Sequence, residues 1–257
     1  MVLSLRKRIN YNHTYNTTTF AVSVSNVSIR RNMKKSFYSE LAYFIGIAVL
    51  ALGTATMEQA DFGMSMVVAP AYLLHLKVSQ TLSFFSFGMA EYVFQGILLS
   101  VMMLMLKRFR TAYLFSFITA VFYGFTLDMM LNLMGYVPCS GFAARTIFYI
   151  LGMIVCAIGV SLLFHTYIPL EAYEMFVKEM SAKLDMDINR FKTIYDCASC
   201  AVAVLMSFAF FGFGRFEGVK LGTVICAIIN GRLIGICSVW LERNFEFKDG
   251  IKLRKLF

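Results

Sequence analysis

The sequence predicts an all-α membrane protein of about six transmembrane helices, arranged as two inverted three-helix repeats. Hydrophobic residues make up 59% of the chain and charged residues only 15%, whereas soluble domains have about 25% charged residues. Several uncharged apolar runs are long enough to cross a bilayer, which requires roughly 20 residues. Connections rich in lysine and arginine alternate with connections poor in them, which is typical of multi-pass membrane proteins.

The chain begins with a polar and basic segment, residues 1–35, which we expect to be a disordered cytoplasmic tail. A transmembrane domain is expected over residues 36–242, and a second basic cytoplasmic tail over residues 243–257. The first span is predicted at about 39–57, since Leu41 to Thr56 is an apolar run without a charge.

A short apolar run, 62–76, follows the polar end of the first span and contains Pro70. This run is too short to cross roughly 30 Å of hydrocarbon, and the proline removes a backbone donor from its middle. Irregular backbone at membrane depth is tolerated only where protein or a water-filled cavity satisfies it. We therefore expect a half-span that enters and leaves on one face, with Asp61 capping its N-terminus.

The remaining spans follow in two groups, with one further helical segment between the fourth and fifth spans. That segment, 170–182, has apolar residues at helical spacing and charges on the opposite face. It is either an interfacial amphipathic helix or a second half-helix that corresponds to 62–76. The five later spans are expected at about 84–106, 111–134, 143–166, 193–213 and 221–241.

The distribution of basic residues predicts the orientation of the spans. Nineteen Lys and Arg residues fall in the connections that lie on the same side as the two tails. Four fall in the connections on the opposite side. Cytoplasmic loops carry the excess of positive charge, so we expect both termini to be cytoplasmic. This orientation requires an even number of crossings, which agrees with 62–76 being a half-span.

Glycine spacing suggests that the chain contains an internal repeat. Gly46 and Gly53 in the first span have the same separation as Gly152 and Gly159 in the fourth. Each of these spans precedes a short helix-like piece and two more spans, and the two spans cross in opposite directions. This pattern predicts inverted repeats, an architecture common among secondary transporters. The repeats are expected at about 39–134 and 143–241.

Ionisable groups within a membrane are costly, so they are the first candidates for a functional site. Glu91 and Asp196 occupy similar places in the two repeats, and such a carboxylate pair can bind a cation or relay protons. Alternatively, both reach the interface, and Arg232 pairs with a carboxylate to hold helices together. The candidate ligand-binding residues are Glu58, Asp61, Pro70, Glu91, Asp128, Asn132, Asp196, Asn230 and Arg232.

Several functional classes are disfavoured by the sequence. The six cysteines and three histidines form no metal-ligand cluster. No phosphate-binding loop or paired nucleophile and base is recognisable. We therefore expect no metal, no cofactor and no enzymatic activity. The basic residues lie in short clusters beside apolar spans, so we expect membrane lipids, and not nucleic acid, as their partners.

Three stretches taken together resemble the YczE/YyaS/YitT family of bacterial integral membrane proteins. They are Ala60-Asp61-Phe62-Gly63-Met64-Ser65, Phe122-Tyr123-Gly124-Phe125-Thr126-Leu127-Asp128 and the segment 218–231. The likeness covers about residues 39–241, although the sequence departs from the family pattern at Leu170 and Arg232. The resemblance implies a multi-pass protein of the bacterial inner membrane. It implies no particular substrate, since the family has none that is generally established.

The function that we expect is that of a secondary-transporter-like carrier for a small anionic or amphipathic solute. Residues 62–76 and 170–182 would line its site, with Glu91, Asp128 and Asp196 as ion or proton partners. The alternative is a non-transporting accessory protein that stabilises or recruits a partner through residues 170–190 and the basic tails. Polar side chains that face a common cavity would favour transport, and a dry bundle with an exposed cytoplasmic patch would favour the accessory role.

Overall fold

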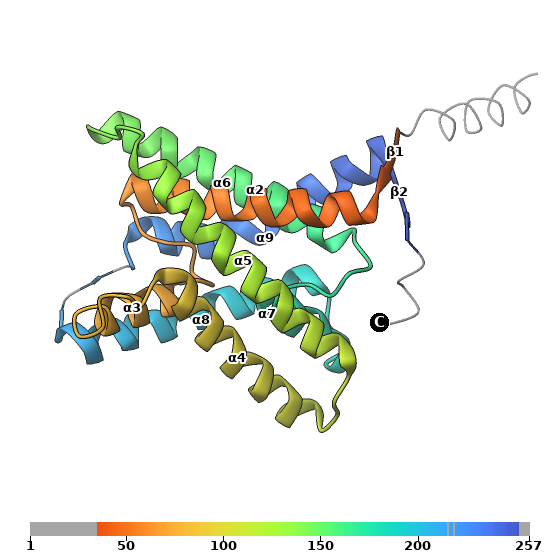
Figure 1. The fold of residues 1–257 in the computed structure, drawn as a ribbon, viewed down its shortest axis with the longest axis horizontal. Helices are drawn as coiled ribbons and strands as arrows, with labels where there is room; N and C mark the ends of the chain where they lie inside the picture. The colour runs from red at the N-terminus through yellow and green to blue at the C-terminus, as the bar shows by residue number, and fades with distance from the viewer. Residues whose placement is uncertain (1–34, 215, 218, 252–257) are drawn as a thin grey trace, which may run out of the picture. The chain divides into compact units, whose positions relative to one another are not determined.

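The computed structural model describes residues 35–214, 216–217 and 219–251, which contain eight helices and one two-stranded sheet (Figure 1). The described residues from Ser36 onward belong to one compact unit. Except for Lys35, the predicted tail lies outside the described residues. The elements are β1 (Lys35–Tyr38), α2 (Ser39–Ala60), α3 (Ala69–Val78), α4 (Phe87–Leu106), α5 (Thr111–Gly135), α6 (Phe142–Phe164), α7 (Ala172–Lys183), α8 (Ile188–Phe211), α9 (Leu221–Asn244) and β2 (Phe245–Lys248).

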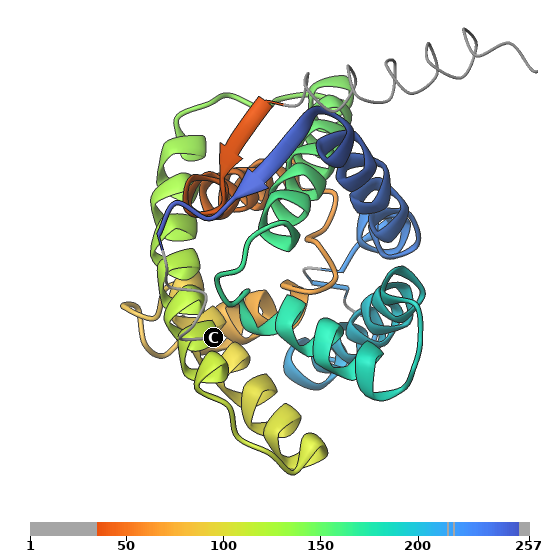
Figure 2. The ribbon, with the colours of Figure 1, turned by 90° about the vertical axis from the view of Figure 1, so that its right-hand side faces the viewer.

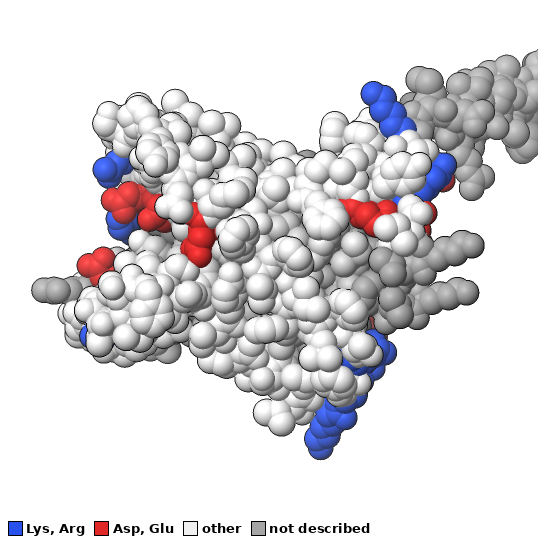
Figure 3. Space-filling model, in the orientation of Figure 1, with Lys and Arg blue, Asp and Glu red and all other residues white. Residues whose placement is uncertain are grey.

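Six of the described helices are long and apolar enough to cross a membrane: α2, α4, α5, α6, α8 and α9. This confirms the predicted class, an all-α multi-pass membrane protein. The helices begin and end within a few residues of the predicted spans. Figure 3 shows charged side chains gathered toward two ends of the visible face, with a mostly uncharged band between them. Such a band is expected of a surface that faces lipid.

The most extensive helix contact in the fold is that between the antiparallel helices α2 and α6. A methyl group on Gly53 would lie 2.6 Å from the Cys156 backbone nitrogen and 2.9 Å from the Gly152 carbonyl oxygen. A methyl group on Gly159 would lie 2.6 Å from the Leu50 nitrogen. The two backbones therefore approach more closely than any larger side chain permits.

The contacts of these glycines are consistent with the predicted inverted repeat. Gly46 faces Gly159 and Gly53 faces Gly152, so a two-fold exchange of α2 with α6 converts one contact into the other. Other helix pairs follow the same exchange: α2–α5 corresponds to α6–α9, α4–α5 to α8–α9, α3–α4 to α7–α8, and α3–α8 to α4–α7. This pattern agrees with two inverted repeats of four helices each, one of them short.

The eight helices pack as two groups, and each group takes two helices from each repeat. The outer group, α2, α5, α6 and α9, is built on the α2–α6 contact. The inner group comprises α3, α4, α7 and α8, which contact one another in a ring. Figure 2 shows α2, α6 and α9 in one half of the view and α3, α4, α7 and α8 in the other. The groups meet through the pairs α4–α5, α8–α9 and α5–α7.

The predicted half-span 62–76 is only partly helical. Residues 62–68 form a loop, and α3 follows with ten residues, about 15 Å at the helical rise. Pro70 lies in the first turn, where a helix needs no backbone donor, and not in the middle of a helix. The predicted Asp61 cap of this helix is wrong. Asp61 ends α2 with a left-handed φ of 56°, whereas α3 begins after Val68 without a side-chain cap.

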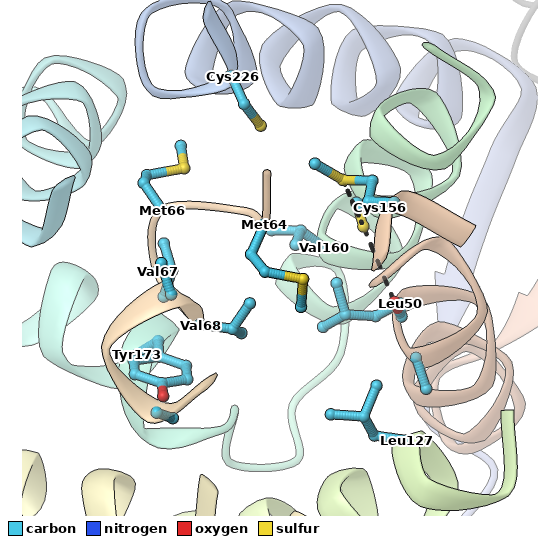
Figure 4. Packing of buried hydrophobic residues seen from close by; sticks show 14 of the residues in the cluster. Leu50, Met64, Met66, Val67, Val68, Leu127, Cys156, Val160, Tyr173 and Cys226 are labelled. Atoms are coloured by element: carbon cyan, nitrogen blue, oxygen red, sulfur yellow. Dashed lines mark hydrogen bonds between the residues drawn. The ribbon is translucent and has the colours of Figure 1, made fainter. Parts of the chain in front are cut away.

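The loop 62–68 is buried because apolar side chains anchor it in the core. Met64, Val67 and Val68 extend between Leu50 of α2 and Tyr173 of α7 (Figure 4). The Gly222 backbone nitrogen, at the start of α9, donates to the Phe62 carbonyl oxygen at 3.1 Å. Non-helical backbone at this depth is thus surrounded by protein, as it must be in a membrane.

The second repeat contains a corresponding buried loop before α7. Its Pro169 and Leu170 carbonyl oxygens accept hydrogen bonds from Thr119 and Ser116 of α5, at 2.9 and 2.5 Å. A helix of the opposite repeat therefore satisfies each loop, α9 for the first and α5 for the second. This reciprocity places the N-termini of both short helices in the interior.

The beginning of the predicted C-terminal tail, 243–257, contains a strand that the sequence did not indicate, and residues 252–257 lie outside the described residues. β2 pairs with β1, and Phe37 packs against Phe245 and Phe247 across the pair. Glu40, in the first turn of α2, accepts hydrogen bonds from the backbone nitrogens of Gly250 and Ile251. The flanks of the first and last spans are therefore joined.

We expect Gly53→Ala to destabilise the protein by about 1–3 kcal/mol, the usual cost of overpacking, because the backbone of α6 leaves no room for a methyl group. Gly159→Ala should cost a similar amount, since Gly53 and Gly159 exchange under the two-fold relation and a methyl group on Gly159 would lie 2.6 Å from the Leu50 nitrogen. The measurement is the thermal midpoint in detergent. Gly96→Ala is the control, because its methyl group meets only Phe117 at 3.5 Å. Equal midpoints for Gly53→Ala and Gly96→Ala would contradict the proposed contact.

Candidate functional site

A cluster of buried ionisable side chains lies where α7 packs between α4 and α8. We call it the acidic cluster, and it consists of Glu91 from α4, Glu171 at the N-cap of α7, Glu174 from α7, and Lys192 and Asp196 from α8. Each member is at most 4% exposed. Buried charges are rare in proteins unless they are paired or functional, so this concentration marks the strongest candidate site.

Glu91 connects the cluster to the start of α7. Its Oε2 accepts hydrogen bonds from Tyr173 Oη at 2.9 Å and from Gln95 Nε2 at 3.1 Å. Gln95 lies one turn further along α4, and its Oε1 accepts a hydrogen bond from the Ala172 backbone nitrogen at 3.0 Å. The first backbone donors of a helix have no partner within the helix. The side chains of α4 supply one here, which positions the N-terminus of α7.

Lys192 joins α7 to α8. Its Nζ donates to Glu174 Oε1 at 2.9 Å and lies 3.2 Å from Asp196 Oδ1, one turn along α8. These three side chains are nearly inaccessible to solvent. A buried ion pair of this kind contributes little net stability, but the loss of one partner is expensive because it leaves an uncompensated charge.

A small cavity lies beside the cluster at the meeting of the two helix groups. Its volume is about 30 Å³, and its polar lining includes Glu171, Glu174 and Lys192 from the inner group. The outer group contributes Thr54 of α2, Tyr123 of α5 and Asn230 of α9. A space of this size holds a water molecule but no larger solute. The conformation is therefore a closed one, with a polar centre reached from both repeats.

The charges of the acidic cluster do not balance. Four carboxylates face one ammonium group, so full ionisation would leave three negative charges without a partner. Within the described residues, Glu91 Oε1, Glu171 Oε2 and Glu174 Oε2 accept no hydrogen bond. Burial, together with the carboxylates of Glu174 and Glu91, raises the pKa of Glu171 well above its usual range. The cluster therefore has a strong tendency to take up protons or other cations.

The structure brings three of the predicted site residues together. Glu91 and Asp196 belong to the acidic cluster, and Asn230 faces it across the cavity. Asp128 does not belong to the cluster, because it accepts hydrogen bonds from Ser86 Oγ at 2.7 Å and the Gly88 nitrogen at 2.9 Å. Its carboxylate thus secures the start of α4 and lies away from the cavity.

Two further predicted residues, Asn132 and Arg232, are exposed on α5 and α9 and do not reach the cavity. Within the described part of the chain no carboxylate pairs with Arg232, so the alternative in which it holds helices together through such a pair is not supported. A third, Pro70, is buried in the first turn of α3 and contributes only packing. Asn132 and Arg232 were predicted because they are polar residues within a span. The position along a span does not specify which face of the helix a side chain occupies.

Glu58 and Asp61 line a separate and more open cavity of about 120 Å³ near the start of α9. Asp61 forms ion pairs with Lys220 and, at 3.4 Å, with Arg145. These groups are partly exposed, and ion pairs of this kind contribute about 0–1 kcal/mol. The pairs therefore connect the end of α2 to α6 and α9 and give no sign of a ligand site.

Three members of the cluster, Glu171, Glu174 and Lys192, were not among the predicted site residues. The charged side chains of 170–182 were expected on the exposed face of the helix, whereas the buried surface of α7 includes Glu174. The interpretation of this segment as a second half-helix is therefore favoured over an interfacial helix. The available signal was the Lys192–Asp196 spacing, which places opposite charges on one face at the start of an apolar helix.

Comparison with known proteins gives a family but no function. Residues 37–239 match the model of a family of unknown function (DUF6198). The match includes every member of the acidic cluster and both repeats up to residue 239 of α9. No curated protein and no solved structure gives a significant match.

We expect Lys192→Met to destabilise the protein by about 3–5 kcal/mol at pH 8, because Glu174 and Asp196 lose their buried counter-charge. Thermal unfolding in detergent measures the loss. The exposed Lys178→Met on α7 is the control and should be nearly neutral. Lys192→Arg keeps the positive charge and should lose less stability than Lys192→Met, whereas equal losses would indicate that Lys192 acts through packing alone.

The raised pKa of Glu171 predicts a stability that depends on pH. The folded protein holds the proton to higher pH than the unfolded chain, so the stabilisation is complete below the unfolded pKa. It is then lost as pH rises toward the folded pKa, by up to about 1.4 kcal/mol per pH unit. Glu171→Gln should reduce this slope between pH 5 and pH 8, measured by chemical unfolding. The exposed Glu246→Gln should leave it unchanged, and an unchanged slope in Glu171→Gln would rule out this assignment.

Proposed function

The chain belongs to the DUF6198 family, whose description assigns no activity, and we propose that it is a proton-coupled secondary carrier of a small cationic solute. One observation carries this proposal: a buried acidic cluster with surplus negative charge lies at the junction of two inverted repeats. In secondary transporters the substrate and the coupling ion bind at such a junction, near short or broken helices. Ionisable residues inside the membrane mark the same pathways.

The proposed mechanism is competition between protons and the solute for the same carboxylates. With the cluster protonated, the three surplus charges disappear and the closed conformation is stable. Deprotonation restores the charge imbalance, which favours entry of a cation between the two helix groups. Tyr123 and Tyr173 border the cavity, and aromatic faces are good contacts for an organic cation. Rocking of the inner group against the outer group would then expose the cavity to alternate faces.

The charge of the solute in this proposal differs from the sequence-based expectation. An anion was expected because the free N-terminus of a half-helix attracts negative charge. Gln95 Oε1, however, already accepts a hydrogen bond from the first backbone donor of α7. Glu171 holds the N-cap position of the same helix, although its side chain makes no capping hydrogen bond. The protein therefore already compensates part of the positive end of the helix. The surplus negative charge beside it favours a cation.

Protons suit the cluster better than a metal ion does as the coupling species. Within the described residues, no three His, Cys, Asp or Glu side chains converge as metal ligands do. The carboxylates are instead distributed over α4, α7 and α8, an arrangement that allows a proton to pass from one to the next. Proton relays of buried acidic groups are common in pumps and transporters.

We also propose that the protein lies in the bacterial inner membrane with both termini in the cytoplasm, and that it is related to the YczE/YyaS/YitT family. The excess of Lys and Arg in the tails and in the α4–α5 and α7–α8 connections supports cytoplasmic termini. The resemblance to the YczE/YyaS/YitT family supports the bacterial inner membrane, and its extent, 39–241, nearly coincides with the matched residues 37–239. The alternative accessory role receives less support, because much of its expected recognition surface on α7 is buried. We retain a carrier, and not an enzyme, as the proposed class.

The test is transport in proteoliposomes loaded with a pH-sensitive dye and exposed to a panel of small organic cations. A transported cation should drive protons out of acid-loaded vesicles. We expect Glu91→Gln and Asp196→Asn to reduce the initial rate by about tenfold or more, equivalent to at least 1.4 kcal/mol. Asp128→Asn is the matched control and should retain the rate within about twofold, because its carboxylate caps α4. Transport that survives both cluster substitutions in correctly folded protein would refute the mechanism.

A further inference from the structure

An open groove between α8 and α9 combines basic side chains with an apolar wall. Its volume is about 870 Å³, and apolar side chains of α9 form most of its wall. Gly231 and Gly235 create the hollow, since neither carries a side chain that would fill it. Three arginines and the tryptophan also line it: Arg190, Arg232, Arg243 and Trp240. No acidic side chain borders the groove.

Arg232 is the least expected of these residues. It lies midway along α9, a helix long and apolar enough to span the membrane, and its side chain is exposed. Within the described residues it forms no ion pair. An arginine in the middle of a transmembrane helix is unfavourable unless an anionic group or water compensates it. The partner must therefore come from outside the described chain.

We propose that the groove binds one anionic phospholipid, with its phosphate among the arginines and an acyl chain along α9. Charge complementarity supports this occupant, since three guanidinium groups surround one hollow and guanidinium matches phosphate in bidentate fashion. The apolar wall formed by Ile236 and Val239 suits an acyl chain. Trp240 has the position of an interfacial anchor, where tryptophan is enriched.

A second copy of the chain fits the groove less well. Dimers of identical chains usually pair the same surface on each subunit. Such a dimer would place Arg232 and Arg243 against their own copies, and like charges brought together in an apolar interface are unfavourable. The pair Gly231 and Gly235 has the spacing of a helix-packing motif, but the arginine between them opposes close packing of two copies.

The chain contains a single tryptophan, Trp240, which makes the groove directly observable. The protein is reconstituted into phosphatidylcholine vesicles that contain a low mole fraction of brominated lipid, either phosphatidylglycerol or phosphatidylcholine. Bromine quenches tryptophan fluorescence only at close contact. We expect brominated phosphatidylglycerol to quench Trp240 more strongly than an equal fraction of brominated phosphatidylcholine. Arg232→Gln should reduce the preference by about fivefold, the factor that corresponds to one basic residue at an anionic surface.

The control is Lys107→Gln, which removes an exposed cation at the end of α4, remote from the groove. It should leave the preference unchanged. Equal quenching by the two brominated lipids would overturn the proposal, because the groove would then contain bulk lipid. Quenching that disappears for both lipids as the protein becomes denser in the vesicle would indicate a second copy as the occupant and would also overturn it. Neither result depends on whether the chain transports a solute.

Discussion

The close contact between the backbones of α2 and α6 is the constraint on which the rest of the fold depends. Four glycines allow the two helices to approach, and each repeat supplies two of them. Because Gly46 meets Gly159 and Gly53 meets Gly152, the contact fixes a two-fold relation between the repeats. That relation determines where the buried loops, the short helices and the remaining spans lie. The repeat is therefore a property of the packing as well as of the sequence.

The two-fold relation concentrates polar groups where hydrophobic packing alone would exclude them. Each short helix begins in the interior, and its preceding loop is satisfied by a helix of the other repeat. In the second repeat this arrangement brings Glu171 and Glu174 beside Glu91 and Asp196. Lys192 compensates only part of this charge. A cluster so unbalanced stabilises no fold by itself, which is the physical reason to regard it as functional.

The sequence predicted the spans well because their signal is local. Long apolar runs, charge asymmetry and the glycine spacing are each visible within one segment, and they correctly indicated six spanning helices. Glu91, Asp196 and Asn230 were recognised as polar groups inside spans, and they do lie at the centre. The loop at 62–68 was mistaken for helix because its apolar composition reflects burial in the core and not helical periodicity.

The errors concern groups whose role depends on tertiary partners. Asp128 is an intramembrane carboxylate by sequence, but only the structure reveals that Ser86 and Gly88 bind it. Glu174 lies opposite the apolar positions of its helix and is nevertheless buried, because α8 covers that face with Lys192. Asp61 ends one helix and does not begin the next, a distinction set by its φ angle. None of these facts is encoded in residue type and spacing alone.

The pairing of β1 with β2 has a mechanical consequence. It closes α2 and α9, both of the outer group, into a loop through Glu40 and the backbone of Gly250 and Ile251. This pairing links the two ends of the outer group and so restricts the movement of α2 relative to α9. No strand pairing joins the inner helices among the described residues, and they contact the outer group through α5 and α9. If the two helix groups move relative to each other, we therefore expect the inner helices to move while the outer helices stay in place.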